Sequence, residues 1–549
     1  MRNALTSSIA RPAVRIIAAA ALAAGLVGAA AIGQASASSA GHQCGRPTVS
    51  RQPFGETIEP YTGQLTQVFR YTLTNCRGMQ VRILTYGAIT QSVVVPGRNG
   101  QKANVVLGFK TLQDYVDFAS PPVTANGGPY FGETIGRYGN RIAKGTFQLN
   151  GQTYTLQINN GVNSLHGGLV GFGNHVWASH AVRTKKAAGV ALKLVSPNGD
   201  GGGAPGSPGC PSGCTGYPAQ ITVFVTYTLN NRGDLAIHYR VHNDSATLST
   251  VTNLTNHSYF NLAGEASAAG SAYGQFIQIN ADNYSPTDST QIPLPLANGV
   301  PVKGTPFDFR APHTLGSRIS DVSAPDNVPP SFASATGGKS QLLIAQGYDH
   351  NWILNPQTAK TTGPLGLNLA ARAVDPRSGR ELTVWTDQPG VQFYSGNFLN
   401  GTLVGISGHT YRQGAGYTFE TQHFPNSPNQ PNFPSTELFA GQTQTSTTIF
   451  AFSSYPSVPT LPVRHFALRR WRTGTPPPVR PIGPMRGDTG NRDRRPVAAA
   501  RRPLAGLPGV LRAAGRVLRH HGAADQRGVQ VHRDAHQLAG YVQNFWIGA

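Results

Sequence analysis

Several segments of the chain carry histidine or acidic side chains, which can exchange protons with a bound molecule when their pKa values lie near the working pH. One is VTNLTNHSYFNL (251–262), which has amides, hydroxyls and a histidine where a strand usually has valine or isoleucine. In a strand, His257 and Tyr259 share one polar face. Leu254 and Phe260 lie on the other face and can be buried against a second sheet. From this stretch alone, a buried histidine hydrogen-bonded by its neighbours remains the alternative.

Four further segments carry side chains that could bind a ligand or react with it. They are Asn140 and Arg141 in GRYGNRIAKG, His166 in NSLHGG, Asp349 in GYDHNW, and Glu420 in FETQHFPNSPN. His166 precedes two glycines, where the backbone can approach a ligand closely. Taken singly, these residues could belong to a surface ion pair, a turn or an exposed strand. Taken together with His257 and Tyr259, they favour a polar, aromatic groove that binds a sugar.

The elements that must position these side chains are strands. FQLNGQTYTL (147–156) predicts a hairpin with a type I′ turn at Asn150-Gly151. In ITVFVTYTL (221–229), large apolar or aromatic residues at every second position alternate with three threonines and Phe224, as in a half-buried strand. Many short strands separated by glycine, proline and asparagine predict an all-β sandwich, with one domain over residues 38–455.

Taken together, the segments resemble the aldose 1-epimerases (galactose mutarotases). The family's motifs NRI, NSLHGG, NHSYFNL, GYDHN and ETQHFPxSPN occur here in the same order, and the resemblance extends over roughly residues 55–455. It implies a large β-supersandwich with a shallow sugar cleft on its concave face. It also implies that the protein interconverts the α and β anomers of free aldoses such as glucose and galactose, with no cofactor.

The resemblance implies a role for each candidate residue. Glu420 corresponds to the general base and His257 to the general acid, and the substrate-binding positions are Asn140, Arg141, His166, Tyr259 and Asp349. These residue types suit the chemistry, because ring opening needs a base at the C1 hydroxyl and an acid at the ring oxygen. Two other functions remain open, a glycoside hydrolase that uses Glu420 and Asp349 and a sugar-binding protein without catalysis.

Residues 1–37 have the pattern of a secretory signal peptide. Three arginines precede an alanine-rich apolar run, and Ala35-Ser36-Ala37 is a small-residue cleavage motif. We therefore expect cleavage after Ala37, a secreted extracellular protein and no membrane anchor.

The four cysteines fit this interpretation, because an even count in an exported protein predicts disulfides. Cys44–Cys76 with Cys210–Cys214 is the simplest of three possible pairings. The second pair lies in the glycine- and proline-rich segment 198–215, which we expect to be an unpacked surface loop. No histidine or cysteine cluster has metal-ligand spacing, so no metal site is predicted.

The net charge of +21 comes mostly from the C-terminal segment. Residues 456–549 contain 16 arginines and 4 aspartates, with neither lysine nor glutamate. This composition predicts a mostly disordered tail or a segment translated from a shifted reading frame, and we favour the second interpretation. Because the charge belongs to the tail, it gives no reason to expect a nucleic-acid partner for the main domain. We expect a monomer that acts on a small aldose.

Overall fold

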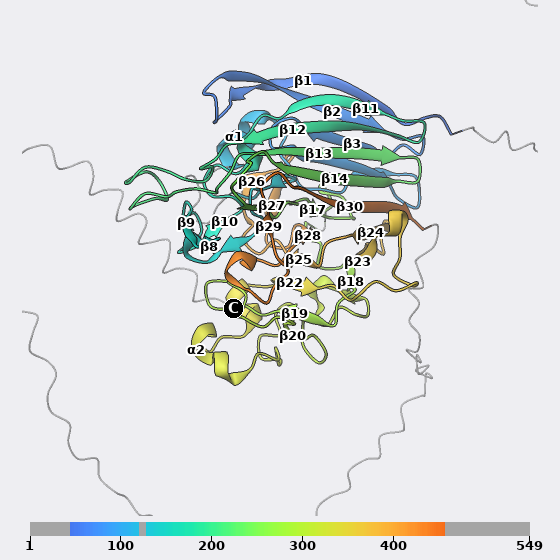
Figure 1. Ribbon diagram of the computed structural model, residues 1–549. Coiled ribbons are helices and arrows are strands. Elements are labelled where there is room, and N and C mark those ends of the chain that lie inside the picture. Colours follow the sequence, from blue (N-terminus) through green and yellow to red (C-terminus); the bar gives the residue numbers. More distant parts are fainter. Residues whose placement is uncertain (1–43, 120–127, 269, 456–549) are drawn as a thin grey trace, which may run out of the picture. The chain divides into compact units, whose positions relative to one another are not determined.

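The computed structural model describes residues 44–119, 128–268 and 270–455, and these residues form mainly antiparallel β-sheet (Figure 1). The largest sheet has nine strands in the order β11 (Ala178–Arg183), β12 (Ala187–Ser196), β13 (Ile221–Asn230), β14 (Asp234–Asn243), β30 (Thr443–Ser454), β24 (Arg380–Thr386), β23 (Asn368–Val374), β18 (Phe276–Ile279) and β21 (His313–Thr314). The predicted all-β class is confirmed.

Two further sheets complete the main architecture. The first has five strands, β1 (Thr48–Ile58), β2 (Leu65–Thr74), β3 (Gln80–Leu84), β4 (Thr90–Pro96) and β5 (Lys102–Asn104). The second has six strands in the order β17 (Tyr259–Phe260), β28 (Tyr417–Gln422), β25 (Gly390–Tyr394), β22 (Asp349–Ile353), β19 (Asn283–Ser285) and β20 (Val300–Pro301). The five-stranded sheet contacts the β11–β13 end of the nine-stranded sheet.

Short elements connect and flank these sheets. The two-stranded pairs are β6 (Thr134–Ile135) with β16 (Thr255–Asn256), β7 (Arg141–Ile142) with β10 (Ser164–Leu165), β8 (Thr146–Leu149) with β9 (Gln152–Thr155), β15 (Thr250–Val251) with β29 (Glu437–Leu438), and β26 (Asn400–Val404) with β27 (Thr410–Arg412). The α-helices are α1 (Leu112–Ala119), α2 (Ala333–Thr336) and α3 (Gln341–Ala345). The 3₁₀ helices are Ala143–Gly145, Phe172–Asn174, Leu315–Ser317, Pro330–Phe332, Pro364–Gly366 and Ser427–Asn429.

One apolar core joins the three main sheets. Its members include Tyr71 of β2, Val225 of β13 and Phe393 of β25, and all three are almost fully buried. Strand β13 shows how the sequence specifies this packing, because buried residues alternate with half-buried ones along the strand, as predicted. The hairpin is also as predicted, since β8 and β9 flank Asn150-Gly151 and both turn residues have positive φ.

The prediction of one continuous strand over residues 251–262 is wrong. Residues 250–260 instead contain three two-residue strands, and each pairs with a different partner: β15 with β29, β16 with β6, and β17 with β28. The polar side chains are the reason, because several bind backbone groups of other segments. Asn253 donates to the carbonyl oxygens of Gly139 and His423, and Asn261 donates to that of Ala415.

Both disulfides form in the predicted pairing, Cys44 with Cys76 and Cys210 with Cys214. No helix in the described part of the chain is long and apolar enough to cross a membrane. The predicted signal peptide (1–37) and the arginine-rich tail (456–549) lie outside the described residues.

Candidate active site

A cavity of about 550 Å³ opens between the six-stranded sheet and the loops beside it. All of the site residues predicted from the sequence line this cavity: Asn140, Arg141, His166, His257, Tyr259, Asp349 and Glu420. They come from five separate segments of the chain, so the fold brings together what the sequence keeps apart.

Strand alternation in the six-stranded sheet explains why carboxylates face the cavity. On β22, β25 and β28, one face carries aromatic core residues such as Trp352, Phe393 and Phe419. The opposite face carries polar residues, and Gln392 of β25 pairs in register with Glu420 of β28. The same strands therefore supply both the core and the wall of the site.

A small antiparallel pair holds the cationic and imidazole groups. Arg141 of β7 pairs with Leu165 of β10, which places Asn140 beside His166. Asn140 and His166 both have φ in the left-handed region, at 66° and 53°. Such conformations are uncommon for residues other than glycine and concentrate at functional sites.

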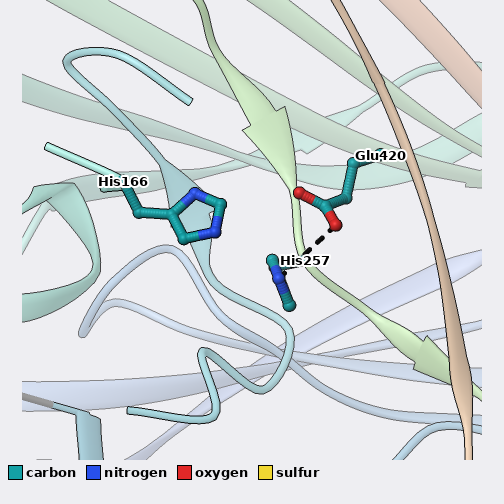
Figure 2. A group of neighbouring side chains, drawn as sticks. All are labelled: His166, His257 and Glu420. Atoms are coloured by element: carbon teal, nitrogen blue, oxygen red, sulfur yellow. Dashed lines mark ion pairs between the residues drawn. The ribbon is translucent and has the colours of Figure 1, made fainter. Parts of the chain in front are cut away.

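Three buried side chains of the cavity lining, His166, His257 and Glu420, converge on one another (Figure 2), and this cluster is called the inner end of the cavity. His257 Nε2 lies 3.5 Å from Glu420 Oε1, and the two side chains are 5% and 2% exposed. The ring of His166 stands nearly perpendicular to that of His257, with 5.2 Å between centroids. Glu420 Oε1 accepts a hydrogen bond from Thr418, whereas neither Glu420 Oε2 nor His257 Nδ1 has a partner among the described residues.

Burial shifts the pKa values of this pair in opposite directions. It raises the pKa of Glu420 to about 8, with help from the nearby Asp349 carboxylate, and lowers the pKa of His257 to about 3. Between pH values of about 3 and about 8 the pair therefore holds one proton, which lies on Glu420. Transfer of that proton to His257 produces a carboxylate and an imidazolium, which are a base and an acid.

The side wall of the cavity is a hydrogen-bonded polar network. Asp349 accepts hydrogen bonds from Gln291 at 3.0 Å and from Gln392 at 2.7 Å. Arg141 donates to Gln291 at 2.7 Å and to Asn160 at 2.9 Å. Alternating charged and amide groups of this kind suit the recognition of several hydroxyl groups.

His166, His257 and Glu420 also form the type of ligand set that binds zinc, with their donor atoms within 4.8 Å of one another. Tertiary structure creates this cluster, and sequence spacing gave no sign of it. However, His166 Nδ1 accepts a hydrogen bond from the backbone N–H of Asn140 at 3.1 Å. This bond places the proton of neutral His166 on Nε2, the nitrogen that a metal would need. The geometry thus favours His166 as a hydrogen-bond donor over a metal ligand.

Four residues of the site were missing from the sequence prediction. Tyr130, Tyr394 and Gln291 line the cavity, and Gln392 lies behind Asp349. Only Gln392 gave a signal, as a lone amide within the apolar strand GVQFY. The others lie in segments whose local pattern is typical of ordinary turns and core strands.

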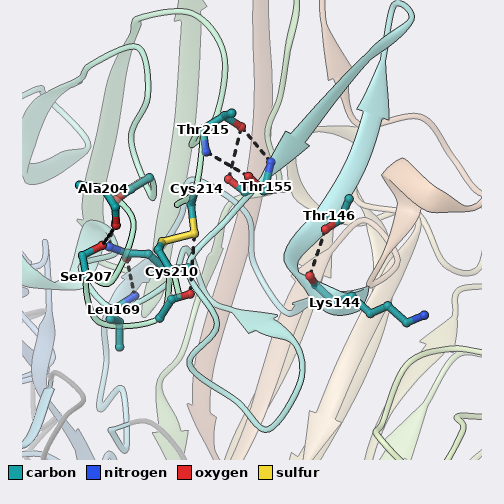
Figure 3. The surroundings of a disulfide bond; sticks show 12 residues. Lys144, Thr146, Thr155, Leu169, Ala204, Ser207, Cys210, Cys214 and Thr215 are labelled. Atoms are coloured by element: carbon teal, nitrogen blue, oxygen red, sulfur yellow. Dashed lines mark hydrogen bonds between the residues drawn. A yellow bond between two sulfur atoms is a disulfide. The ribbon is translucent and has the colours of Figure 1, made fainter. Parts of the chain in front are cut away.

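The glycine-rich segment 198–215 lies mostly at the surface, as predicted, but it is not unpacked, and Figure 3 shows the surroundings of its disulfide. Cys210 is fully buried, and the backbone N–H groups of Gln157 and Ile158 donate to carbonyl oxygens of this loop. Gln157 in turn accepts a hydrogen bond from the N–H of Leu169. The glycines allow the close backbone contacts that hold this loop against the segment that carries His166.

Comparisons with known proteins agree with this geometry. The family model for aldose 1-epimerase matches residues 70–451. Galactose mutarotases from Sus scrofa and Homo sapiens are 37% and 38% identical, each over 74% of this chain and 99% of the relative. An aldose 1-epimerase from Escherichia coli K12 is 32% identical over 69% of this chain and 94% of its own length.

A solved structure gives the same result. The galactose 1-epimerase from Lactobacillus acidophilus NCFM superposes with a TM-score of 0.57 and 25% identity, over 74% of this chain and 99% of that one. The galactose mutarotase-like sandwich predicted from the sequence is thereby confirmed. The chain belongs to the aldose 1-epimerase family, and it is an isomerase.

Proposed function

We propose that this enzyme interconverts the anomers of free glucose and galactose, with Glu420 as general base and His257 as general acid. The observation that carries the assignment is their contact of 3.5 Å at the inner end of the cavity. There, a sugar's C1 hydroxyl and its ring oxygen, which share one carbon atom, can reach both groups together.

Ring opening transfers two protons, one from the sugar to Glu420 and one from His257 to the sugar. Glu420 takes the proton of the C1 hydroxyl, the C1–O5 bond breaks as C1 becomes an aldehyde carbon, and His257 gives a proton to O5. Rotation about C1–C2 then presents the other face of the aldehyde. Closing reverses each transfer, since protonated Glu420 returns a proton to the C1 oxygen and neutral His257 removes one from O5. The pair holds one proton before and after each half-reaction.

The remaining residues bind the sugar and orient it. Neutral His166 presents its Nε2–H to the cavity, because Asn140 fixes the tautomer. Arg141 and Asp349 supply donors and acceptors to hydroxyl groups away from the anomeric carbon. Tyr259 contributes an aromatic surface, with its ring 5.1 Å from that of His257.

The two alternative functions are less well supported. A glycoside hydrolase would need Asp349 as a second reacting carboxylate, yet Asp349 is already bound by two amides and faces Arg141. A sugar-binding protein without catalysis has no need for a buried carboxyl with a raised pKa beside a histidine.

Polarimetry tests the proposal directly. Freshly dissolved α-D-glucose or α-D-galactose should reach equilibrium rotation faster with the purified chain than in buffer alone, and EDTA should leave the acceleration unchanged. No acceleration with either sugar would refute the proposed function. Loss of activity in EDTA would show that the acid–base pair is not sufficient.

We also propose that the protein is exported, and that the mature chain begins at Ser38. The basic start, the apolar run and the Ala35-Ser36-Ala37 motif support cleavage, and two disulfides suit an oxidising compartment. Sequencing the N-terminus of protein recovered from the culture medium tests this, and retention of the full chain inside the cell would contradict it.

A further inference from the structure

Arg141 and Asp349 face each other in the cavity without a direct hydrogen bond. The guanidinium Nη1 lies 3.6 Å from Asp349 Oδ2, whereas an unhindered pair of these groups closes to about 2.7–2.9 Å. The Gln291 amide binds both of them. Its oxygen accepts from Arg141 Nη2 at 2.7 Å, and its nitrogen donates to Asp349 Oδ2 at 3.0 Å.

The backbone around Gln291 is built to hold this amide in place. Gln291 has a φ of 63°, in the left-handed region, and its N–H donates to the Asp288 carbonyl at 3.0 Å. Asp288 Oδ1 accepts hydrogen bonds from the N–H groups of Thr290 and Ile292. Asn163 binds the Thr290 carbonyl, which ties the turn to the segment that carries His166. A conformation that is unfavourable for glutamine persists because these contacts fix it.

We propose that Gln291 is a positioning residue that keeps Arg141 and Asp349 apart and available to the sugar. This inference rests on the proposed function, because it assumes that these two groups bind hydroxyls of an aldose. Without the amide, the guanidinium and the carboxylate would close into a direct pair. The guanidinium and the carboxylate would then hydrogen-bond to each other and would form fewer hydrogen bonds with a ligand.

The main test replaces Gln291 with methionine, which has a similar length and is also unbranched at Cβ but cannot form either hydrogen bond. Gln291→Met should raise KM about tenfold and leave kcat within about threefold, the pattern for a loss of binding common to ground state and transition state. Gln278→Met is the matched control, since Gln278 is a half-buried glutamine on β18, outside the cavity, that donates to the Arg310 carbonyl. Its KM should equal that of the wild type.

A double-mutant cycle separates positioning from general loss of structure. If Gln291 acts through Asp349, Gln291→Met added to Asp349→Asn should raise KM by less than about threefold. Gln291→Glu should raise KM at least as much as Gln291→Met, because its carboxylate would face that of Asp349. Melting temperatures of all variants show whether they fold.

Two outcomes would overturn the inference while leaving the proposed function intact: a folded Gln291→Met variant with wild-type KM, or full additivity with Asp349→Asn. An inactive wild-type chain would instead remove the proposed function itself. The inference and its foundation therefore fail in distinguishable ways.

Discussion

The inner end and the side wall of the cavity differ in how fully their ionisable side chains are hydrogen-bonded. At the inner end, Glu420 and His257 are buried with one polar atom each unpartnered among the described residues, and their pKa values are displaced from the ordinary range. On the side wall, Arg141 and Asp349 each have two amide partners. Unsatisfied groups are ready to exchange protons, whereas satisfied groups are fixed in place for recognition.

The largest expected effect lies at the inner end. Glu420→Gln and His257→Asn should each lower kcat by about 10²–10⁴-fold, because each removes one partner in proton transfer. Initial rates of mutarotation over a range of sugar concentrations give kcat and KM separately. A near-wild-type kcat in Glu420→Gln would require another base, and the inner end would then not differ from the side wall in its role.

Changes on the side wall should act mainly on binding. Arg141→Gln or Asp349→Asn should raise KM by about 10–100-fold, since each loses charge-assisted hydrogen bonds, with a smaller change in kcat. The same rate measurements test this. If these variants lost kcat as severely as Glu420→Gln, the wall would take part in proton transfer.

The pH profile should reveal the shared proton. The raised pKa of Glu420, about 8, means that the pair loses this proton above that pH, so kcat/KM should fall about tenfold per pH unit above it. Rates between pH 6 and 10, corrected for the uncatalysed reaction, measure this limb. A profile that stays flat to pH 10 would contradict the assignment of one proton to the pair.

The same shift predicts a change in stability. Because folding raises the Glu420 pKa from 4.5 to about 8, the contribution of this carboxyl to stability is present below pH 4.5 and is lost as pH rises through 8. Glutamine does not ionise, so the Glu420→Gln variant keeps this stability at high pH. Its melting temperature at pH 9 should exceed the wild-type value by roughly 2–4 °C. Asp349→Asn is the comparison, and an equal gain there would mean that the effect is not specific to the inner end.

The smallest expected effect comes from removing residues 456–549. The residues described for the inner end and the side wall all precede this segment, and the last described strand, β30, ends at Ser454. Truncation after Tyr455 should leave kcat, KM and the melting temperature close to those of the full chain. An unfolded or inactive truncated chain would show that the segment contributes to the fold.

The sequence was informative where side chains repeat with the period of a strand. Alternation in 221–229 predicted β13, and the motifs around His257 and Glu420 predicted the residues of the inner end. It was misleading where polar side chains bind distant backbone, as in 251–262, because such bonds replace strand pairing with contacts that no local pattern encodes. The hydrogen bonds of Gln291 could not be predicted for the same reason, since its partners Arg141 and Asp349 are 150 and 58 residues away in sequence.

The glycine-rich segment 198–215, which contains the Cys210–Cys214 disulfide, has a consequence for hydrogen exchange. Its carbonyl oxygens at Gly201 and Gly209 accept the amide protons of Gln157 and Ile158, so these amides should exchange slowly while the disulfide is intact. Reduction should release the loop and speed exchange at both amides, and at Leu169, which binds Gln157. The rate at Leu169 would then report, without any sugar present, how far the disulfide's influence reaches toward His166.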